Sequence, residues 1–168
     1  MAEEKGAGFT APYLKLTDKV QRFKPKAGVA MLDILPYEVD EGNPYAEPGA
    51  LHYERTFYVH RSIGADENSY LCPIRTSKKP CPICEFRAKL MKDGADEDLI
   101  KTLAPKQRQL FNVINLKEPE KGVQLWDMSY HNFGKLLEQS IRDSEPEDEW
   151  EKFFYLEEGW TLKVGFTE

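Results

Sequence analysis

The spacing of apolar residues along the chain predicts several short strands. The segment "GVAMLDILPYEV" (28–39) is rich in branched residues, which is typical of a strand, and Pro36 implies an edge or a bulge there. "LHYERTFYVHRSI" (51–63) predicts a strand whose two faces both mix aromatic with charged or polar side chains. "RQLFNVINL" (108–116) and "VQLWDM" (123–128) predict paired strands joined by the turn "KEPEKG".

Helical spacing is confined to short segments. Phe86 and Leu90 stand four residues apart in a helix that should end near Gly94. "ADEDLIKTLAP" predicts another short helix, which begins with acids and ends at a proline. "SYHNFGKLLEQSI" (129–141) places its apolar residues on one helical stripe, with Ser129 as a candidate cap.

The last segments, "FFYL" and "WTLKVGF", predict a hairpin. Its inward residues should be Trp160, Leu162, Val164 and Phe166. About six short strands with interspersed helices predict a mainly β fold with small helices (α+β), whose antiparallel sheet closes into a five- to six-stranded barrel. We expect residues 1–12 to be a flexible amino terminus and residues 13–168 to form the core. Because the last strand runs almost to the end, we also expect a fragment or a missing sheet partner.

The composition is that of a globular protein with one ordinary core. The chain has 168 residues, of which 40% are hydrophobic and 31% are charged. The sequence does not begin with the basic residues and apolar run of a secretion signal. No apolar stretch approaches the roughly 20 residues of a spanning helix. We therefore expect a soluble, intracellular protein with no membrane partner.

Charge is unevenly distributed along the chain. The formal net charge of −6 argues against a nucleic-acid partner. However, residues 1–92 carry 14 basic and 12 acidic side chains, whereas residues 93–168 carry 9 and 17. A local field can attract an anion even when the total charge is negative, so the total excludes neither class of partner.

The three cysteines lie close to one histidine in the sequence, as His60, Cys72, Cys81 and Cys84. Three thiolates and one imidazole form a common structural zinc set, and the Cys81-Pro-Ile-Cys84 pair can aim both sulfurs at one point. An odd number of cysteines fits a reducing compartment better than a disulfide framework. Four protein ligands leave no open coordination position, so the sequence predicts one structural Zn²⁺ in a subdomain inserted at residues 60–92.

Other interpretations of these four residues stay open. The cysteines could be ordinary buried residues, a redox-active pair, or a nucleophile with a histidine base. The flanking segments lack the βαβ context of a thioredoxin-like redox pair. His52 competes with His60 for the fourth ligand position, although it lies further from the cysteines in sequence.

The order histidine, cysteine, C-x-x-C has a known counterpart. The pattern His60…Cys72-Pro…Cys81-Pro-Ile-Cys84-Glu resembles the zinc module of the T-even-type bacteriophage single-stranded DNA-binding (helix-destabilising) proteins. The resemblance covers roughly residues 20–168. It implies an OB-fold core with an inserted zinc-binding subdomain and a basic, aromatic cleft for single-stranded DNA. It also implies a role in phage replication, recombination and repair, partners among the phage replication and recombination proteins, and a location in the cytoplasm of the infected bacterial host.

A binder of single strands needs aromatic side chains that stack on bases, and Lys or Arg along the phosphates. Residues 53–61 supply both kinds, and the cysteine segment adds basic side chains that could form one wall of a cleft. Tyr58 shares a strand face with His60 and should lie near the metal. A core position stays open for Phe57, and a solvated loop for Lys78 and Lys79. The candidate contacts are Tyr53, Arg55, Phe57, Tyr58, Arg61, Arg75, Lys78, Lys79 and Arg87.

Two other functions compete with single-strand binding. The acidic total fits a zinc-stapled protein-interaction or transcription-factor-like module, although no helix-turn-helix or paired C-x-x-C ribbon supports it. A metal-dependent nuclease should show a phosphate loop, an H-E-x-x-H motif or a carboxylate cluster, and we find none of these in the sequence. We therefore expect a binding protein and not an enzyme.

Overall fold

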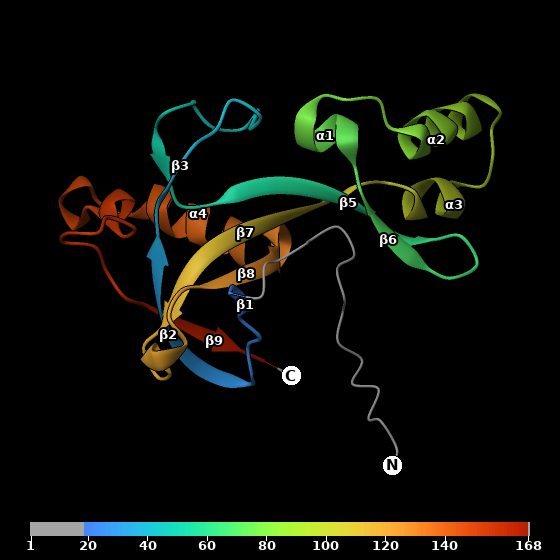
Figure 1. Cartoon of the computed structure of the whole chain (residues 1–168). Coiled ribbons are helices and arrows are strands. Elements are labelled where there is room, and N and C mark those ends of the chain that lie inside the picture. Colours follow the sequence, from blue (N-terminus) through green and yellow to red (C-terminus); the bar gives the residue numbers. More distant parts are fainter. Residues whose placement is uncertain (1–18, 168) are drawn as a thin grey trace, which may run out of the picture.

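A computed structural model describes residues 19–167 and shows a curled, mostly antiparallel sheet (Figure 1). The predicted flexible segment, residues 1–12, lies outside the described residues. The strands are β1 (Gln21–Arg22), β2 (Gly28–Leu35), β3 (Tyr37–Glu38), β4 (Leu51–His52), β5 (Arg55–Ile63), β6 (Asn68–Leu71), β7 (Lys106–Asn115), β8 (Gln124–Ser129) and β9 (Leu162–Phe166). The helices are α1 (Pro73–Ser77), α2 (Pro82–Lys92), α3 (Glu97–Thr102) and α4 (Lys135–Asp143), with short turns η1 (Pro119–Lys121), η2 (Tyr130–Gly134), η3 (Pro146–Asp148) and η4 (Trp150–Lys152).

Strand β7 organises the sheet. One of its edges pairs antiparallel with β8, while the other pairs with β5 over its first half and with β2 over its second half. Strand β2 also pairs with β9, and β1 joins β8 in parallel. The predicted pairing of segments 108–116 and 123–128 is confirmed, with Phe111 opposite Trp126.

The sheet is an open path and not a closed ring. Its path ends at β9 on one side and at β1 on the other, and within residues 19–167 no backbone pairing joins these two strands. Aromatic side chains bridge the gap, because the ring of Phe166 lies 6.2 Å from that of Phe23 and 5.6 Å from that of Trp126. The expected α+β fold with a sheet core and small helices is therefore confirmed, but the closed barrel is not shown.

The core lies inside the curl of the sheet. The rings of Phe111, Trp126 and Phe133 contact one another with centroids between 4.5 and 5.4 Å apart. Aliphatic side chains of β2, including Leu32 and Ile34, complete this cluster. Each such buried side chain stabilises the fold by roughly 1.5–3 kcal/mol relative to an exposed one. The sheet is therefore held by ordinary hydrophobic burial.

The first two predicted strands are each divided in the structure. The segment 28–39 separates into β2 and β3 at Pro36, because proline has no N–H for the ladder. Strand β2 is not an edge strand, since it pairs on both sides. The segment 51–63 separates into β4 and β5 around residues 53 and 54.

The predicted terminal hairpin is wrong. The "FFYL" segment forms turns in which backbone N–H groups donate within three residues, and Phe153 is buried against the core. Strand β9 instead pairs with β2, from Gly28 opposite Phe166 to Leu32 opposite Leu162. Leu162 is buried as expected, whereas Trp160 lies before the strand and is exposed.

The predicted helix 129–141 begins with a π-helical turn, η2, and continues as α4. This turn approaches β7 closely at position 134. A Cβ at Gly134 would lie 1.7 Å from Oε1 of the buried Gln109 side chain on β7, so any side chain there would require Gln109 or the turn to move. The packing of this buried side chain therefore favours glycine.

Candidate metal centre and the adjacent tyrosine patch

Three elements bring the predicted metal ligands together. His60 lies on β5, Cys72 immediately precedes α1, and Cys81 and Cys84 stand at the start of α2. Both helices begin with proline, which suits the first helical turn because its missing N–H would have no partner there. Figure 1 shows α1, α2 and α3 gathered beyond one end of the sheet, apart from α4.

The four side chains form one compact donor set. Their ligand atoms all lie within 4.8 Å of one another. Nε2 of His60 lies 3.3 Å from Sγ of Cys81 and 3.5 Å from Sγ of Cys84, and the sulfurs of Cys72 and Cys84 are 3.6 Å apart. A tetrahedral zinc with ordinary bond lengths separates nitrogen from sulfur by about 3.6 Å and two sulfurs by about 3.8 Å. The set could therefore hold one metal ion and is consistent with structural zinc.

A second contact orients the imidazole of His60. Its Nδ1 donates to the carbonyl oxygen of Leu103 at a distance of 2.8 Å, which leaves the Nε2 lone pair directed at the sulfurs. The competing ligand His52 bonds to Glu54 instead, with Nε2 and Oε1 3.2 Å apart. The residue after α3 therefore supports the metal ligand on β5.

Two thiols of this set have a raised pKa. The three cysteines are free of disulfides, and burial is the main cause that raises the pKa of Cys72. Burial, together with the neighbouring Cys72 and Cys81, raises the pKa of Cys84 to about 12. Nucleophilic and redox cysteines are activated by a lowered pKa, so the raised pKa opposes a reactive role for Cys72 and Cys84. A bound divalent cation is the partner that would favour thiolates here.

The metal lobe, which we define as residues 64–105, has almost no hydrophobic interior. Between residues 61 and 108, the only buried residues are Cys72 and Cys81. Helices α1, α2 and α3 bury none of their own residues, other than the flanking cysteines. The four donor atoms are therefore the centre around which this lobe is organised.

A cluster of three exposed side chains and the half-buried Tyr58 adjoins the metal set. We call it the tyrosine patch, consisting of Tyr45, Tyr58, Arg75 and Lys78. The two phenol rings lie 5.9 Å apart, the guanidinium of Arg75 lies 5.7 Å from the ring of Tyr58, and the ammonium of Lys78 lies 5.8 Å from the ring of Tyr45. The hydroxyl of Tyr45 also donates to the carbonyl oxygen of Arg75. Residues from three separate segments thus form one surface.

The tyrosine patch is built directly on the metal ligands. The backbone N–H of Cys72 donates to the carbonyl oxygen of Tyr58 at 2.8 Å, and the N–H of Tyr58 donates to Oγ1 of Thr76 on α1 at 3.1 Å. Lys78 caps the end of α1 in the left-handed conformation, with φ of 61°. Its ammonium group lies over the ring of Tyr45. The position of α1, and with it of both cations, therefore depends on the ligand loop.

The other predicted DNA contacts are dispersed. Phe57 is only 4% exposed, and Tyr53 packs against the core aromatics Phe111 and Phe153, so neither ring is open to a base. Burial raises the pKa of Tyr53, in keeping with this interior position. The remaining residues are distributed as follows: Arg55 pairs with Asp40, Arg87 donates from Nε to the carbonyl oxygen of Ile100, Arg61 is half-buried near the end of β5, and Lys79 is exposed after α1.

Sequence reasoning missed Tyr45. This residue lies in the Pro- and Gly-rich loop between β3 and β4, and its partners Tyr58 and Arg75 stand 13 and 30 residues further along the chain. Loop residues show no periodicity that would indicate which face they cover. The one signal that could have identified Tyr45 is that it is an aromatic residue in a loop otherwise rich in turn-forming residues.

No family model matches the chain, and no curated protein matches its sequence. Among residues 19–167, no helix has the length and apolar character needed to cross a bilayer. Function is therefore inferred from the side chains of the metal set and the tyrosine patch.

Proposed function

We propose that the protein binds single-stranded DNA without sequence preference through the tyrosine patch, and that His60, Cys72, Cys81 and Cys84 hold one structural Zn²⁺. One observation carries this proposal. Two phenol rings and two cations lie together on an exposed surface whose backbone is bonded to a metal-ligand loop. Single-strand binders combine these two kinds of side chain, because bases stack on aromatic rings and cations follow the phosphates.

Each part of the patch has a distinct role in this mechanism. Tyr45 and Tyr58 stack on successive bases, and each base contributes about 1–3 kcal/mol. Arg75 and Lys78 neutralise phosphates, and the exposed Lys79 extends the same basic side. Affinity should fall with salt at a slope of about −0.7 per neutralised phosphate on a double-logarithmic plot. The metal contributes by holding α1 in place, since its four protein ligands leave no position for a substrate.

The finer description of the fold is also a proposal. We propose that the curled sheet is a variant of the OB-fold, with the metal lobe inserted between β5 and β7. The order of the four ligands, shared with the T-even-type phage proteins, supports a role in phage DNA replication, recombination and repair. It likewise supports partners among phage replication and recombination proteins, and action in the cytoplasm of the infected bacterium.

A fluorescence titration with labelled oligo-dT and with a duplex of equal length tests the proposal. We expect the single strand to bind more tightly, and Lys78→Glu to weaken binding about tenfold or more, because it reverses a phosphate contact. Lys92→Glu is the matched control, since Lys92 is an exposed lysine at the far end of α2. Equal or tighter duplex binding would contradict the proposal, as would equal losses from the two substitutions.

One observation favours a second candidate, a zinc-stapled protein-interaction module. Phe86 and Met91 on α2 are 53% and 55% exposed, which is unusual for large apolar side chains. Under this alternative, the metal lobe presents α2 to a protein and the chain ignores nucleic acid. The oligo-dT titration separates the two functions. Neither includes catalysis, so cleavage of a labelled strand with magnesium would contradict both.

A further inference from the structure

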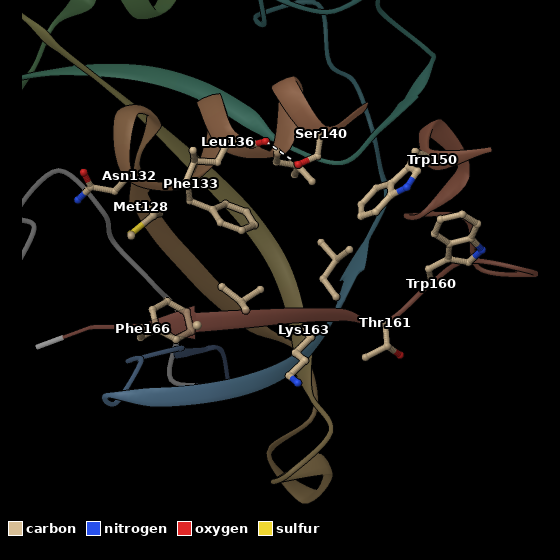
Figure 2. Close-up of a pocket in the computed structure, with 14 residues that line it drawn as sticks. Met128, Asn132, Phe133, Leu136, Ser140, Trp150, Trp160, Thr161, Lys163 and Phe166 are labelled. Atoms are coloured by element: carbon tan, nitrogen blue, oxygen red, sulfur yellow. Dashed lines mark hydrogen bonds between the residues drawn. The ribbon is translucent and has the colours of Figure 1, made fainter. Parts of the chain in front are cut away.

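An apolar pocket shares no lining residue with the tyrosine patch. It has a volume of about 480 Å³ and opens between α4, η4 and β9. Figure 2 shows Leu136 and Ser140 of α4 on one side of the pocket, Lys163 and Phe166 of β9 on the other, and Trp150 and Trp160 together at one end. A cavity of this size accommodates a few side chains of a ligand.

The core residues Phe133, Leu137 and Leu162 line the pocket, but other side chains there are exposed. Trp126 is only 1% exposed, but Trp160 is 39% exposed and Leu136 is 59% exposed. The indoles of Trp150 and Trp160 meet edge to face, with centroids 5.5 Å apart. Exposed aromatic pairs beside a cavity are typical of anchor points in protein interfaces, where Trp carries much of the binding energy.

Strand β9 adds backbone groups to this surface. Six consecutive residues, 161–166, line the pocket, so the strand presents its edge there as well as its side chains. Among residues 19–167, β9 pairs only with β2 and ends the sheet. A free strand edge beside side-chain pockets is the arrangement to which an extended peptide adds as a further strand.

The charge around the pocket indicates which peptide would fit. The one charged residue that lines the pocket itself is Lys163, but residues 143–160, which carry both tryptophans, contain eight acidic side chains and one lysine. Glu149 is paired with Lys152, and the other acids of this segment are largely exposed. A field of this sign attracts basic segments and repels acidic ones. It also opposes the approach of DNA and of a second copy of the same acidic surface.

We propose that this pocket is a docking site for a protein partner, which inserts an extended segment with an aromatic or large aliphatic anchor flanked by Lys or Arg. The anchor fills the pocket against Trp160 and Leu136. The backbone of the segment pairs with the edge of β9. Its basic residues face the acids of 143–160. The site is separate from the tyrosine patch, so partner and DNA bind independently.

Selection of a displayed random 12-residue peptide library on the full chain tests this proposal. We expect enriched sequences to combine Lys or Arg with aromatic or large aliphatic residues. A synthetic copy of an enriched peptide should shift the indole N–H signals of Trp150 and Trp160 in NMR spectra and leave that of Trp126 unchanged. Replacing its Lys and Arg residues by Glu should weaken binding at least tenfold.

Leu136→Lys should weaken peptide binding at least tenfold, because it removes an apolar wall and adds a repelling charge. Leu51→Lys is the matched control, since Leu51 is 63% exposed on β4 and makes the same change in net charge. Both variants should retain oligo-dT affinity within twofold. Four results would overturn the proposal: no enriched peptide, enrichment of acidic peptides, equal binding by the two variants, or a dimer in light scattering that Leu136→Lys abolishes.

Discussion

The sheet core and the metal lobe differ in what stabilises them. The core buries large apolar side chains from distant strands, with Phe111, Trp126 and Leu32 almost fully inaccessible. The metal lobe spans 42 residues by its definition above, yet within it only Cys72 and Cys81 are buried. One region is held by packed apolar surface, whereas the other is organised around four donor atoms that could hold one metal ion.

This difference explains where function can be placed. A region that is stabilised by a hydrophobic core uses its aromatic and large aliphatic side chains for burial, because buried apolar area is what stabilises it. A lobe held by a metal needs little burial, because about 10–16 kcal/mol of zinc binding can order a small module. Its remaining side chains are free to face solvent. The basic part of the tyrosine patch therefore lies on the metal lobe and not on the sheet.

Metal removal should separate the two regions most clearly. With a strong zinc chelator, or with Cys81→Ser, we expect amides of α2 and α3 to lose their protection from hydrogen exchange, while amides of β7 and β8 retain theirs. The reason is that the lobe loses about 10 kcal/mol or more of coordination energy and has no core to replace it. Hydrogen exchange followed by mass spectrometry measures both regions in one sample.

Re-addition of Zn²⁺ to the chelated wild-type protein is the control and should restore protection of α2 and α3. Cys81→Ser should not recover to the same extent. Equal protection of the lobe with and without metal would mean that the lobe is held by packing after all, and the contrast between the two regions would be lost.

Phe111→Ala tests the other half of the contrast. Phe111 contacts both Trp126 and Phe133, so its truncation leaves a cavity in the core. We expect the free energy of unfolding to fall by about 3–5 kcal/mol in urea denaturation. Metal content should stay at one ion per chain below the transition. Loss of the metal before the sheet unfolds would show that the two regions are coupled.

Arg87→Ala asks whether this residue serves the lobe or the DNA. Its Nε donates to the carbonyl oxygen of Ile100 at 3.0 Å and so joins α2 to α3. We expect a loss of about 1 kcal/mol in the local stability of α3, measured by hydrogen exchange, because one hydrogen bond is removed. Affinity for oligo-dT should change less than twofold. A tenfold loss of affinity with α3 unaltered would restore Arg87 as a DNA contact.

Phe86→Ser should have the smallest effect, although it replaces a large apolar residue. The ring is mostly exposed on α2, so we expect a change within about 0.5 kcal/mol in the same urea experiment. Set beside Phe111→Ala, it compares two phenylalanines that the sequence alone does not distinguish. A loss near that of Phe111→Ala would reveal a hydrophobic centre in the metal lobe.

The local features of this protein could be predicted from short stretches of the chain. The four side chains that could hold one metal ion were found by spacing, because Cys81 and Cys84 must share one turn to aim at one point. The central pair of strands was found by alternation and by the turn between them, since both signals act between near neighbours. The helix around Phe86 followed from the spacing of Phe86 and Leu90, four residues apart, and from the glycine near its end.

Contacts between distant segments could not be predicted in this way. Phe57 and Thr56 are neighbours that point to opposite faces of β5, and both are buried. Because β5 is covered on both faces, alternation along it does not indicate which side chains are exposed. Strand β9 pairs with β2 more than 120 residues earlier, and the hydrogen bond from His60 to Leu103 spans 43 positions. Spacing in the sequence identified the cluster of four donor side chains because the C-x-x-C pair is a local signal. The tyrosine patch, the open sheet and the pocket beside β9 depend on which surfaces meet after the chain has folded.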